Sequence, residues 1–339
     1  MGEQLLLKAL RREKVERPPI WLMRQAGRYM AEYRAVREGT TFLELCKTPT
    51  LCADVMRTAV ERIGVDAAII FSDLLPILEP LGFELSFLPG EGPHIGNPLS
   101  TPTDLTRVNG EFDLAQLDFV FETVELTRRA VDPLPVVGFA GAPFTLASYA
   151  IEGGASRQYV RTLAFMKTFP SAWRDFLSIL ARSSARYLNA QIQSGAHVVQ
   201  IFDSWVGRLS VEDYREYVLP ATRELVNAIT PSAPIVYFGS GAPSLLSAFA
   251  TLDVDCVGVD WRTPIADAWQ IIGERAIQGN LDPATLLAPQ DVIRREALRI
   301  LETVGARPGF IFNLGHGILK ETPVENVEFL VKLVKNWRN

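Results

Sequence analysis

Short apolar runs recur along this chain, and most are bounded by glycine, proline or aspartate. Runs of this kind that are rich in β-branched and aromatic residues predict strands, and runs that are apolar throughout predict strands covered on both faces. Eight segments meet this description: residues 20–23, 67–71, 136–139, 198–202, 235–238, 257–259, 276–278 and 310–312. The pattern therefore predicts eight buried strands.

Helical patterns lie between these segments. Apolar side chains recur every four positions over residues 51–63, and Gly64 follows where a left-handed helix cap is favoured. Residues 173–194 show the same pattern and stop before Gly195. A last helix is predicted to open at Thr322, because Thr322, Pro323 and Glu325 match a capping box. Strands and helices are thus expected to alternate.

This alternation predicts an α/β fold, a single-domain (β/α)8 TIM barrel over residues 1–339. Barrels of about 250 residues or more are common, so the length requires no second domain. A doubly wound sheet is the competing architecture. It would usually carry a GxGxxG turn after its first strand, whereas residues 24–28 read Arg-Gln-Ala-Gly-Arg.

Composition excludes several function classes. The net charge of −5 provides no basic excess for nucleic acid or an anionic membrane surface, so neither partner is expected. No apolar run reaches the roughly 18 residues of a transmembrane helix, and the first residues do not resemble a signal peptide. The three cysteines form no CxxC pair, which argues against a disulfide framework or structural zinc. A cytoplasmic protein is expected.

Motifs for bound groups are also missing from the sequence. No GK[ST], HExxH or GxSxG pattern occurs, so a P-loop, a zinc protease site and a serine hydrolase elbow are not expected. The sequence therefore predicts chemistry performed by side chains without a metal or cofactor.

Polar residues gather where the predicted strands end, which is where barrel enzymes place their active sites. They are Arg24, Gln25, Ser72, Asp73, Gly141, Asp203, Ser204, Ser240, Asp260, Asn280, Asp282, Asn313 and His316. Cations and carboxylates are thus expected to converge on one end of the barrel.

Four arginines lie within fourteen residues of the first of these loops, at positions 24, 28, 34 and 37. Guanidinium groups bind carboxylates bidentately and stack on rings, so the cluster suits a planar anionic ligand. The alternative is one solvated amphipathic helix with arginines at helical spacing.

Asp73 and His316 are the remaining candidates. Asp73 ends an apolar run and can accept N–H donors or stabilise positive charge, or it can cap the helix that follows. His316 lies between Gly315 and Gly317, which would let the backbone approach a ligand, although a lone histidine is more often structural. The two other histidines are expected to lie in a loop, at His94, and packed at a strand start, at His197.

Five stretches together resemble the uroporphyrinogen decarboxylase family: residues 21–29, 71–73, 138–145, 152–154 and 313–317. They extend over essentially the whole chain, and RQAGRY together with GFAGAPFT is highly specific. The resemblance implies cofactor-independent conversion of uroporphyrinogen III to coproporphyrinogen III with loss of four CO2. It also implies a distorted barrel and a homodimer.

The resemblance carries site residues onto this chain. The implied substrate-binding residues are Arg24, Gln25, Ala26, Gly27, Arg28, Asp73, Tyr149, Ser204 and His316, with Phe139 and Phe202 as apolar lining. Asp73 and Arg37 are the implied catalytic residues. Asp73 would accept the pyrrole N–H groups and stabilise a cationic intermediate, and Arg37 is a candidate proton donor.

One departure and two alternatives follow. Some family members have histidine after the serine at position 204, whereas this chain has Trp205. A corrinoid-linked methyltransferase of the same superfamily would bind zinc through His and Cys near the chain end, but no cysteine follows Cys256. A non-catalytic tetrapyrrole carrier could use the same arginines.

Overall fold

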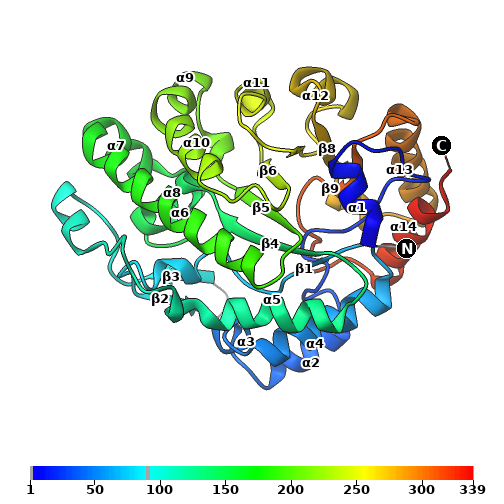
Figure 1. Ribbon diagram of the computed structural model, residues 1–339, viewed down its shortest axis with the longest axis horizontal. Coiled ribbons are helices and arrows are strands. Elements are labelled where there is room, and N and C mark those ends of the chain that lie inside the picture. The colour runs from blue at the N-terminus through cyan, green and yellow to red at the C-terminus, as the bar shows by residue number, and fades with distance from the viewer. Residues whose placement is uncertain (1–2, 89–91, 339) are drawn as a thin grey trace.

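A parallel sheet of seven strands forms the centre of the fold in the computed structural model, which describes residues 3–88 and 92–338 (Figure 1). The strands are arranged in the order β1 (Ala68–Ile69), β4 (Val136–Gly141), β5 (Val198–Asp203), β6 (Ile235–Gly239), β7 (Cys256–Gly258), β8 (Ala276–Leu281) and β9 (Phe310–Leu314). Their side chains are buried almost throughout, as the sequence predicts. A separate hairpin pairs β2 (Leu85–Leu88) with β3 (Gly92–Ile95).

The predicted strand at residues 20–23 is wrong as a strand. Only Ile20 pairs, in one parallel bridge to Phe312 of β9. On the other side the Ile20 carbonyl accepts the N–H of Asp66, just before β1, at 2.8 Å. Pro19 has no N–H to donate, and the N–H of Leu22 is taken by the Gln25 side chain, so no ladder can continue.

This short segment nevertheless closes the curled sheet between its two edge strands. The eighth position of the barrel is therefore filled by one residue in place of a strand, and the fold is a distorted (β/α)8 barrel in a single domain. A buried ion pair anchors the closure: Arg17 holds Asp66 at 2.7 and 2.8 Å, and Asp66 also accepts the Ile20 N–H at 2.8 Å.

Helices surround the sheet (Figure 1). They are α1 (Glu3–Leu10), α2 (Ala31–Glu38), α3 (Phe42–Cys46), α4 (Pro49–Ile63), α5 (Asp118–Ala130), α6 (Pro143–Glu152), α7 (Val160–Thr168), α8 (Pro170–Gln193), α9 (Val211–Asp213), α10 (Leu219–Asn227), α11 (Leu246–Phe249), α12 (Ile265–Ile272), α13 (Gln290–Val304) and α14 (Val324–Asn336). The predicted left-handed cap at Gly64 is confirmed, with φ 71°. Among the described residues no helix is long and apolar enough to cross a bilayer.

The predicted capping box at Thr322 is wrong. Helix α14 begins at Val324 with Pro323 in the cap position, so Thr322 lies one residue too early to cap it. Its hydroxyl is buried and has no hydrogen-bond partner among the residues that the structure describes.

Polar side chains cross the barrel interior. Trp21 Nε1 donates to Gln278 Oε1 at 3.0 Å, and Gln278 Nε2 donates to Gln200 Oε1 at 3.0 Å. Because β5 and β8 are not neighbours in the sheet, the Gln200–Gln278 bond must span the inside. Gln200 Nε2 in turn reaches Met23 Sδ at 3.8 Å. This buried chain of bonds fixes the backbone that leads to Arg24.

Candidate active site

The first and last loops meet at the carboxyl ends of the strands. Met23 donates its N–H to Asn313 Oδ1 at 3.1 Å, and the Met23 carbonyl accepts the N–H of Ile318 at 3.0 Å. Between these bonds Arg24 adopts a left-handed backbone with φ 61°, which is costly for a residue with a side chain. A β-carbon on Gly317 would overlap the Arg24 side chain, so glycine is required for this approach.

His316 lies in the same contact and is partly buried. Burial is the main cause that lowers its pKa to about 4, and the positive charges of Arg24 and Arg262 lower it further. The shift favours a neutral ring near pH 7. A neutral imidazole still offers one donor and one acceptor.

Asp73 lies beside Arg24. Burial raises the Asp73 pKa to about 6, against the opposing effects of a hydrogen bond from the Leu75 N–H at 3.0 Å and the Arg24 charge. The capping alternative is wrong, since the following short 3-10 helix has Leu75 in the cap position with no side-chain cap. Asp73 instead closes a tight turn by accepting the backbone N–H groups of Leu75 and Leu74.

Two tyrosines and a thiol surround Asp73. Burial raises the pKa of Tyr149, Tyr187 and Cys46, and the Asp73 charge raises each of them further, which places all three groups near the carboxylate. Tyr149, on α6, also packs on Trp205 with ring centres 5.7 Å apart. The implied substrate residues Tyr149 and Asp73 are thus brought together.

Arg37 lies near Cys46, because its charge opposes the rise in the pKa of that thiol. Its guanidinium donates to the Thr40 carbonyl and stands over the Phe42 ring at 5.7 Å. Phe71 packs against Phe42 at 6.2 Å. Within the described ranges Arg37 makes no hydrogen bond or ion pair to Asp73, so the two implied catalytic residues flank the site without touching.

The alternative of one solvated arginine helix is wrong, because Arg24 and Arg28 precede helix α2 and only Arg34 and Arg37 lie on it. Arg34 Nη1 donates to the carbonyls of Arg28 and Tyr29, both at 2.9 Å, and so stabilises the loop. Arg28 is exposed, as a residue that captures a carboxylate must be.

Residues 25–27, between Arg24 and Arg28, pack tightly against the rest of the protein. Gln25 is fully buried, accepts the Leu22 N–H at 3.2 Å and donates to the Ala67 carbonyl at 3.1 Å. Its backbone is bonded too, since the N–H donates to the Leu22 carbonyl at 3.0 Å and the carbonyl accepts the Tyr29 hydroxyl at 2.6 Å, so Gln25 supports the fold of the loop. Ala26 is 8% exposed, and a β-carbon on Gly27 would come within 3.3 Å of the Arg24 carbonyl.

An apolar wall lies on the neighbouring strands. Phe139 of β4 meets Phe202 of β5 edge to face at 5.6 Å, and Phe202 meets Phe238 of β6 at 6.0 Å. Phe202 remains partly exposed. The two implied lining residues thus pack against each other, and Phe202 is the more accessible of the two.

Asp203 corrects the expectation that every polar residue at a strand end faces the mouth. It is fully buried, and its carboxylate accepts hydroxyl bonds from Thr145 and Tyr237, each at 2.7 Å. Burial raises its pKa to about 6, and both hydroxyls oppose this shift. Thr145 also accepts the Trp205 N–H at 3.4 Å, so Asp203 supports the loop that carries Ser204, which is partly buried.

Comparison with known proteins decides the family. The profile of the family described as "Uroporphyrinogen decarboxylase (URO-D)" matches residues 1–337. The chain belongs to this family. It is 50% identical over 337 residues to the uroporphyrinogen decarboxylase of Chloroflexus aurantiacus, covering 98% of this chain and 95% of that protein. The corresponding protein of Thermus thermophilus is 45% identical over 332 residues, with 98% and 97% covered.

A solved structure supports the fold of this uroporphyrinogen decarboxylase family member. A methyltransferase from Methanosarcina mazei superposes with a TM-score of 0.84 at 24% identity, covering 98% of each chain. In the described part of this chain no three His, Cys, Asp or Glu residues are grouped to hold a metal ion, and Cys46, Cys52 and Cys256 are free and buried.

Arg262 was not among the residues predicted from the sequence, and it follows β7 at the same end of the strands. Its guanidinium pairs with Asp260 at 2.8 Å and stands over the Trp261 ring at 4.1 Å. Asp260 was predicted at this end of the barrel. Because Arg262 lies only two residues after it, the sequence could have indicated an arginine here as well.

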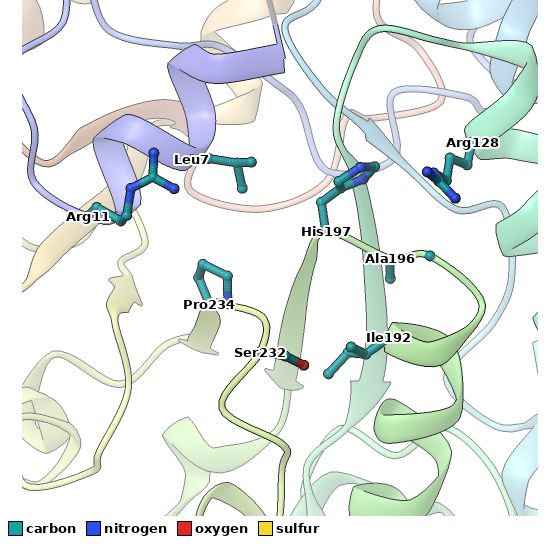
Figure 2. A pocket seen from close by; sticks show the side chains of 9 residues that line it. Leu7, Arg11, Arg128, Ile192, Ala196, His197, Ser232 and Pro234 are labelled. Carbon is teal, nitrogen blue, oxygen red and sulfur yellow. The ribbon is translucent and has the colours of Figure 1, made fainter.

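A cavity of about 440 Å³ lies at the opposite, amino-terminal end of the strands (Figure 2). Figure 2 shows His197, just before β5, between Arg11 and Arg128. The expectation that His197 is packed holds in part: it is half-buried, and its Nδ1 accepts the Val136 N–H at 3.0 Å. None of the implied site residues lines this cavity.

Proposed function

We propose that this chain is a carboxy-lyase that converts the four acetate side chains of uroporphyrinogen III to methyl groups, giving coproporphyrinogen III and four CO2 in tetrapyrrole biosynthesis. The active-site cleft would lie at the carboxyl ends of the barrel strands. One observation carries the proposal: a partly buried carboxylate, Asp73, lies beside the Arg24 cation in a member of the uroporphyrinogen decarboxylase family.

The substrate is an anion with eight carboxylates around four pyrroles. Two unit charges about 4 Å apart interact by roughly 4 kcal/mol at an effective dielectric of 20, so a partly dry cleft needs cations close to those carboxylates. Arg24 and Arg28 supply them at the mouth, and neutral His316 can donate one N–H to a carboxylate. Phe139 and Phe202 would carry the flat apolar body of the pyrroles.

Asp73 would hold the ring centre. A single carboxylate can accept the four pyrrole N–H groups when the macrocycle domes, and each acetate then reaches the same corner after the substrate rotates and binds again. Tyr149 and Ser204 would complete the polar contacts.

The reaction needs a proton and no external electron acceptor. Protonation of a ring carbon makes the pyrrole a cation, and cleavage of the C–C bond to the carboxylate then sends its electron pair into the ring and releases CO2. A proton adds to the new exocyclic carbon, giving the methyl group, while the ring proton leaves. One proton is consumed for each CO2 lost.

Each catalytic residue has one part in this scheme. Asp73 in its anionic form would stabilise the cationic intermediate more than the neutral substrate, which raises the rate. Arg37 would donate the ring proton. Its guanidinium stands over the Phe42 ring, which packs against Phe71, so the donor would lie against the aromatic side of the site.

A cytoplasmic homodimer completes the proposal and is supported by the family resemblance. Sedimentation of the purified protein near twice the 37.6 kDa chain mass would agree with it, and a monomer at micromolar concentration would contradict it.

Anaerobic incubation with uroporphyrinogen tests the activity. Successive appearance of hepta-, hexa-, penta- and tetracarboxylate products is expected. Tight binding without products would instead identify a tetrapyrrole carrier. Stoichiometric zinc in the purified protein, with methyl transfer and no CO2 release, would identify a corrinoid-linked methyltransferase.

A further inference from the structure

Arg262 is held in a fixed orientation at the carboxyl end of β7. Its Nη1 donates to Asp260 Oδ2 at 2.8 Å, and its backbone N–H donates to Asp260 Oδ1 at 2.9 Å. The guanidinium lies over the Trp261 ring at 4.1 Å. Asp260, whose side chain is 3% exposed, is itself held by the Gly241 N–H at 2.5 Å. The arginine is therefore preorganised by buried partners.

The Arg262 side chain nevertheless remains 46% exposed. Within residues 3–88 and 92–338 its side chain makes no hydrogen bond or ion pair except to Asp260. A guanidinium carries five N–H donors, so one bond to Asp260 leaves a free edge for an incoming anion.

Arg262 belongs to the same corner as Arg24 and His316. Both arginine charges act on the His316 ring. The loops also touch through their backbones, because a β-carbon on Gly315 would lie 2.5 Å from the Trp261 nitrogen. Two cations therefore flank a neutral imidazole, and a ligand carboxylate is the group that this arrangement lacks.

We propose that Arg262 is a further substrate-binding residue, which holds a peripheral carboxylate of the tetrapyrrole on the His316 side of the site. The inference rests on the proposed function and adds a carboxylate contact that the resemblance does not imply. Asp260 and Trp261 are its positioning residues: Asp260 orients the fork, and Trp261 keeps its plane fixed. Because the contact is made equally in the ground state and the transition state, it acts on substrate affinity more than on turnover.

Steady-state kinetics with uroporphyrinogen tests the inference. Arg262→Gln should raise KM about tenfold with kcat within about twofold, as expected for loss of one partly exposed charged hydrogen bond. Arg262→Lys should recover part of the affinity, because it keeps the charge without the planar fork. The matched control is Arg129→Gln, which removes one charge from a side chain on α5 that is 76% exposed, and it should leave KM unchanged.

Salt dependence separates a binding role from a structural one. The wild-type KM should rise with ionic strength, and that rise should be smaller in Arg262→Gln. An unchanged KM and salt dependence in Arg262→Gln would overturn the inference. So would a lower kcat and Tm with unchanged KM, because Arg262 would then serve only as a partner for Asp260.

A binding measurement keeps this inference separate from the proposed activity. Should wild-type protein form no product, the proposed function fails, and fluorescence titration with coproporphyrin III still tests Arg262. Affinity about tenfold weaker in Arg262→Gln than in wild type supports the inference, and equal affinity overturns it.

Discussion

Asp73 follows β1 and Asp203 is the last residue of β5 in the same barrel, and burial raises the pKa of each carboxyl group to about 6. Their partners differ. Two hydroxyls satisfy both oxygens of fully buried Asp203. Asp73 receives the backbone N–H of Leu75 at 3.0 Å and a second one from Leu74, and it lies partly exposed beside the Arg24 cation.

The difference separates a structural carboxylate, Asp203, from the carboxylate that we propose acts in catalysis, Asp73. A pKa near 6 marks both groups as desolvated, and it does not distinguish their roles. Their accessibility does. Asp203 is fully buried and bonded within the protein, whereas Asp73 is partly exposed beside Arg24, where a donor from outside can reach it. Predictions that act on one carboxylate and spare the other test this distinction.

Removing the Asp73 charge should have the largest effect. Asp73→Asn should lower turnover about 100- to 1000-fold, the loss typical of removing one preorganised electrostatic group. The amide oxygen can still accept the Leu75 N–H, so the turn should persist. Product formation by chromatography checks this, with exposed Asp253→Asn as the charge-matched control. Near wild-type CO2 release would mean that Asp73 has no electrostatic role.

The same variant should be more stable than the wild type. The folded pKa of Asp73 lies above its unfolded value, so ionisation disfavours the fold at pH 8, and Asp73→Asn should gain about 1–3 kcal/mol there. The gain should shrink as the pH falls through 6 toward 4, where wild-type Asp73 is protonated. Urea unfolding at both ends of this range measures it. A loss of stability at pH 8 would show that Arg24 outweighs desolvation.

A variant of Arg37 tests whether this arginine takes part in the reaction together with Asp73. Arg37→Lys should reduce turnover about tenfold and change KM by less than about twofold, as expected for a misplaced proton donor. Arg34→Lys is the control, because Arg34 bonds only loop carbonyls. Weaker binding with unchanged turnover would make Arg37 an anchor for substrate carboxylates.

Acid should remove the reactive form of Asp73. Since its pKa is about 6 and the anion is the active form, kcat/KM should fall below pH 6 and be about tenfold lower at pH 5. Circular dichroism should show a folded protein over this range, because protonation of both carboxyls favours the fold. A flat profile down to pH 5 would contradict the assignment.

Tyr237→Phe probes the structural carboxylate and should have the smallest effect on catalysis. Loss of one hydroxyl donor to Asp203 should cost about 1–2 kcal/mol of stability at pH 8 and less at pH 5. Turnover should stay within about twofold of wild type, measured beside urea unfolding. A hundredfold loss of turnover would mean that Asp203 also belongs to the reaction.

The sequence predicted the barrel well because burial on both faces leaves an unambiguous apolar pattern. Seven of the eight predicted segments overlap observed strands. Residues 20–23 failed because an apolar run records burial, and it does not reveal that Pro19 and Gln25 remove the ladder bonds. The capping box at Thr322 failed for a related reason, since a one-residue shift in the helix start is invisible to the motif.

The sequence predicted the positions of the candidate site residues better than their protonation states. Arg24, Asp73 and His316 lie where the strand ends place them. Neutral His316 could not be anticipated, because its pKa depends on arginines from two distant loops. Arg262 was not predicted because its orientation depends on contacts with Asp260 and Trp261, which the sequence does not show.

The single bridge at Ile20 has a consequence for synthesis of the protein. Ile20 pairs with Phe312, so the two sides of the seam lie near opposite ends of the chain. A nascent chain that emerges amino-terminus first can pair β1 and β4 to β8 in turn, but it cannot close the ring until almost all of it has left the ribosome. Arg24, four residues beyond the seam, therefore reaches its place among the last parts of the molecule.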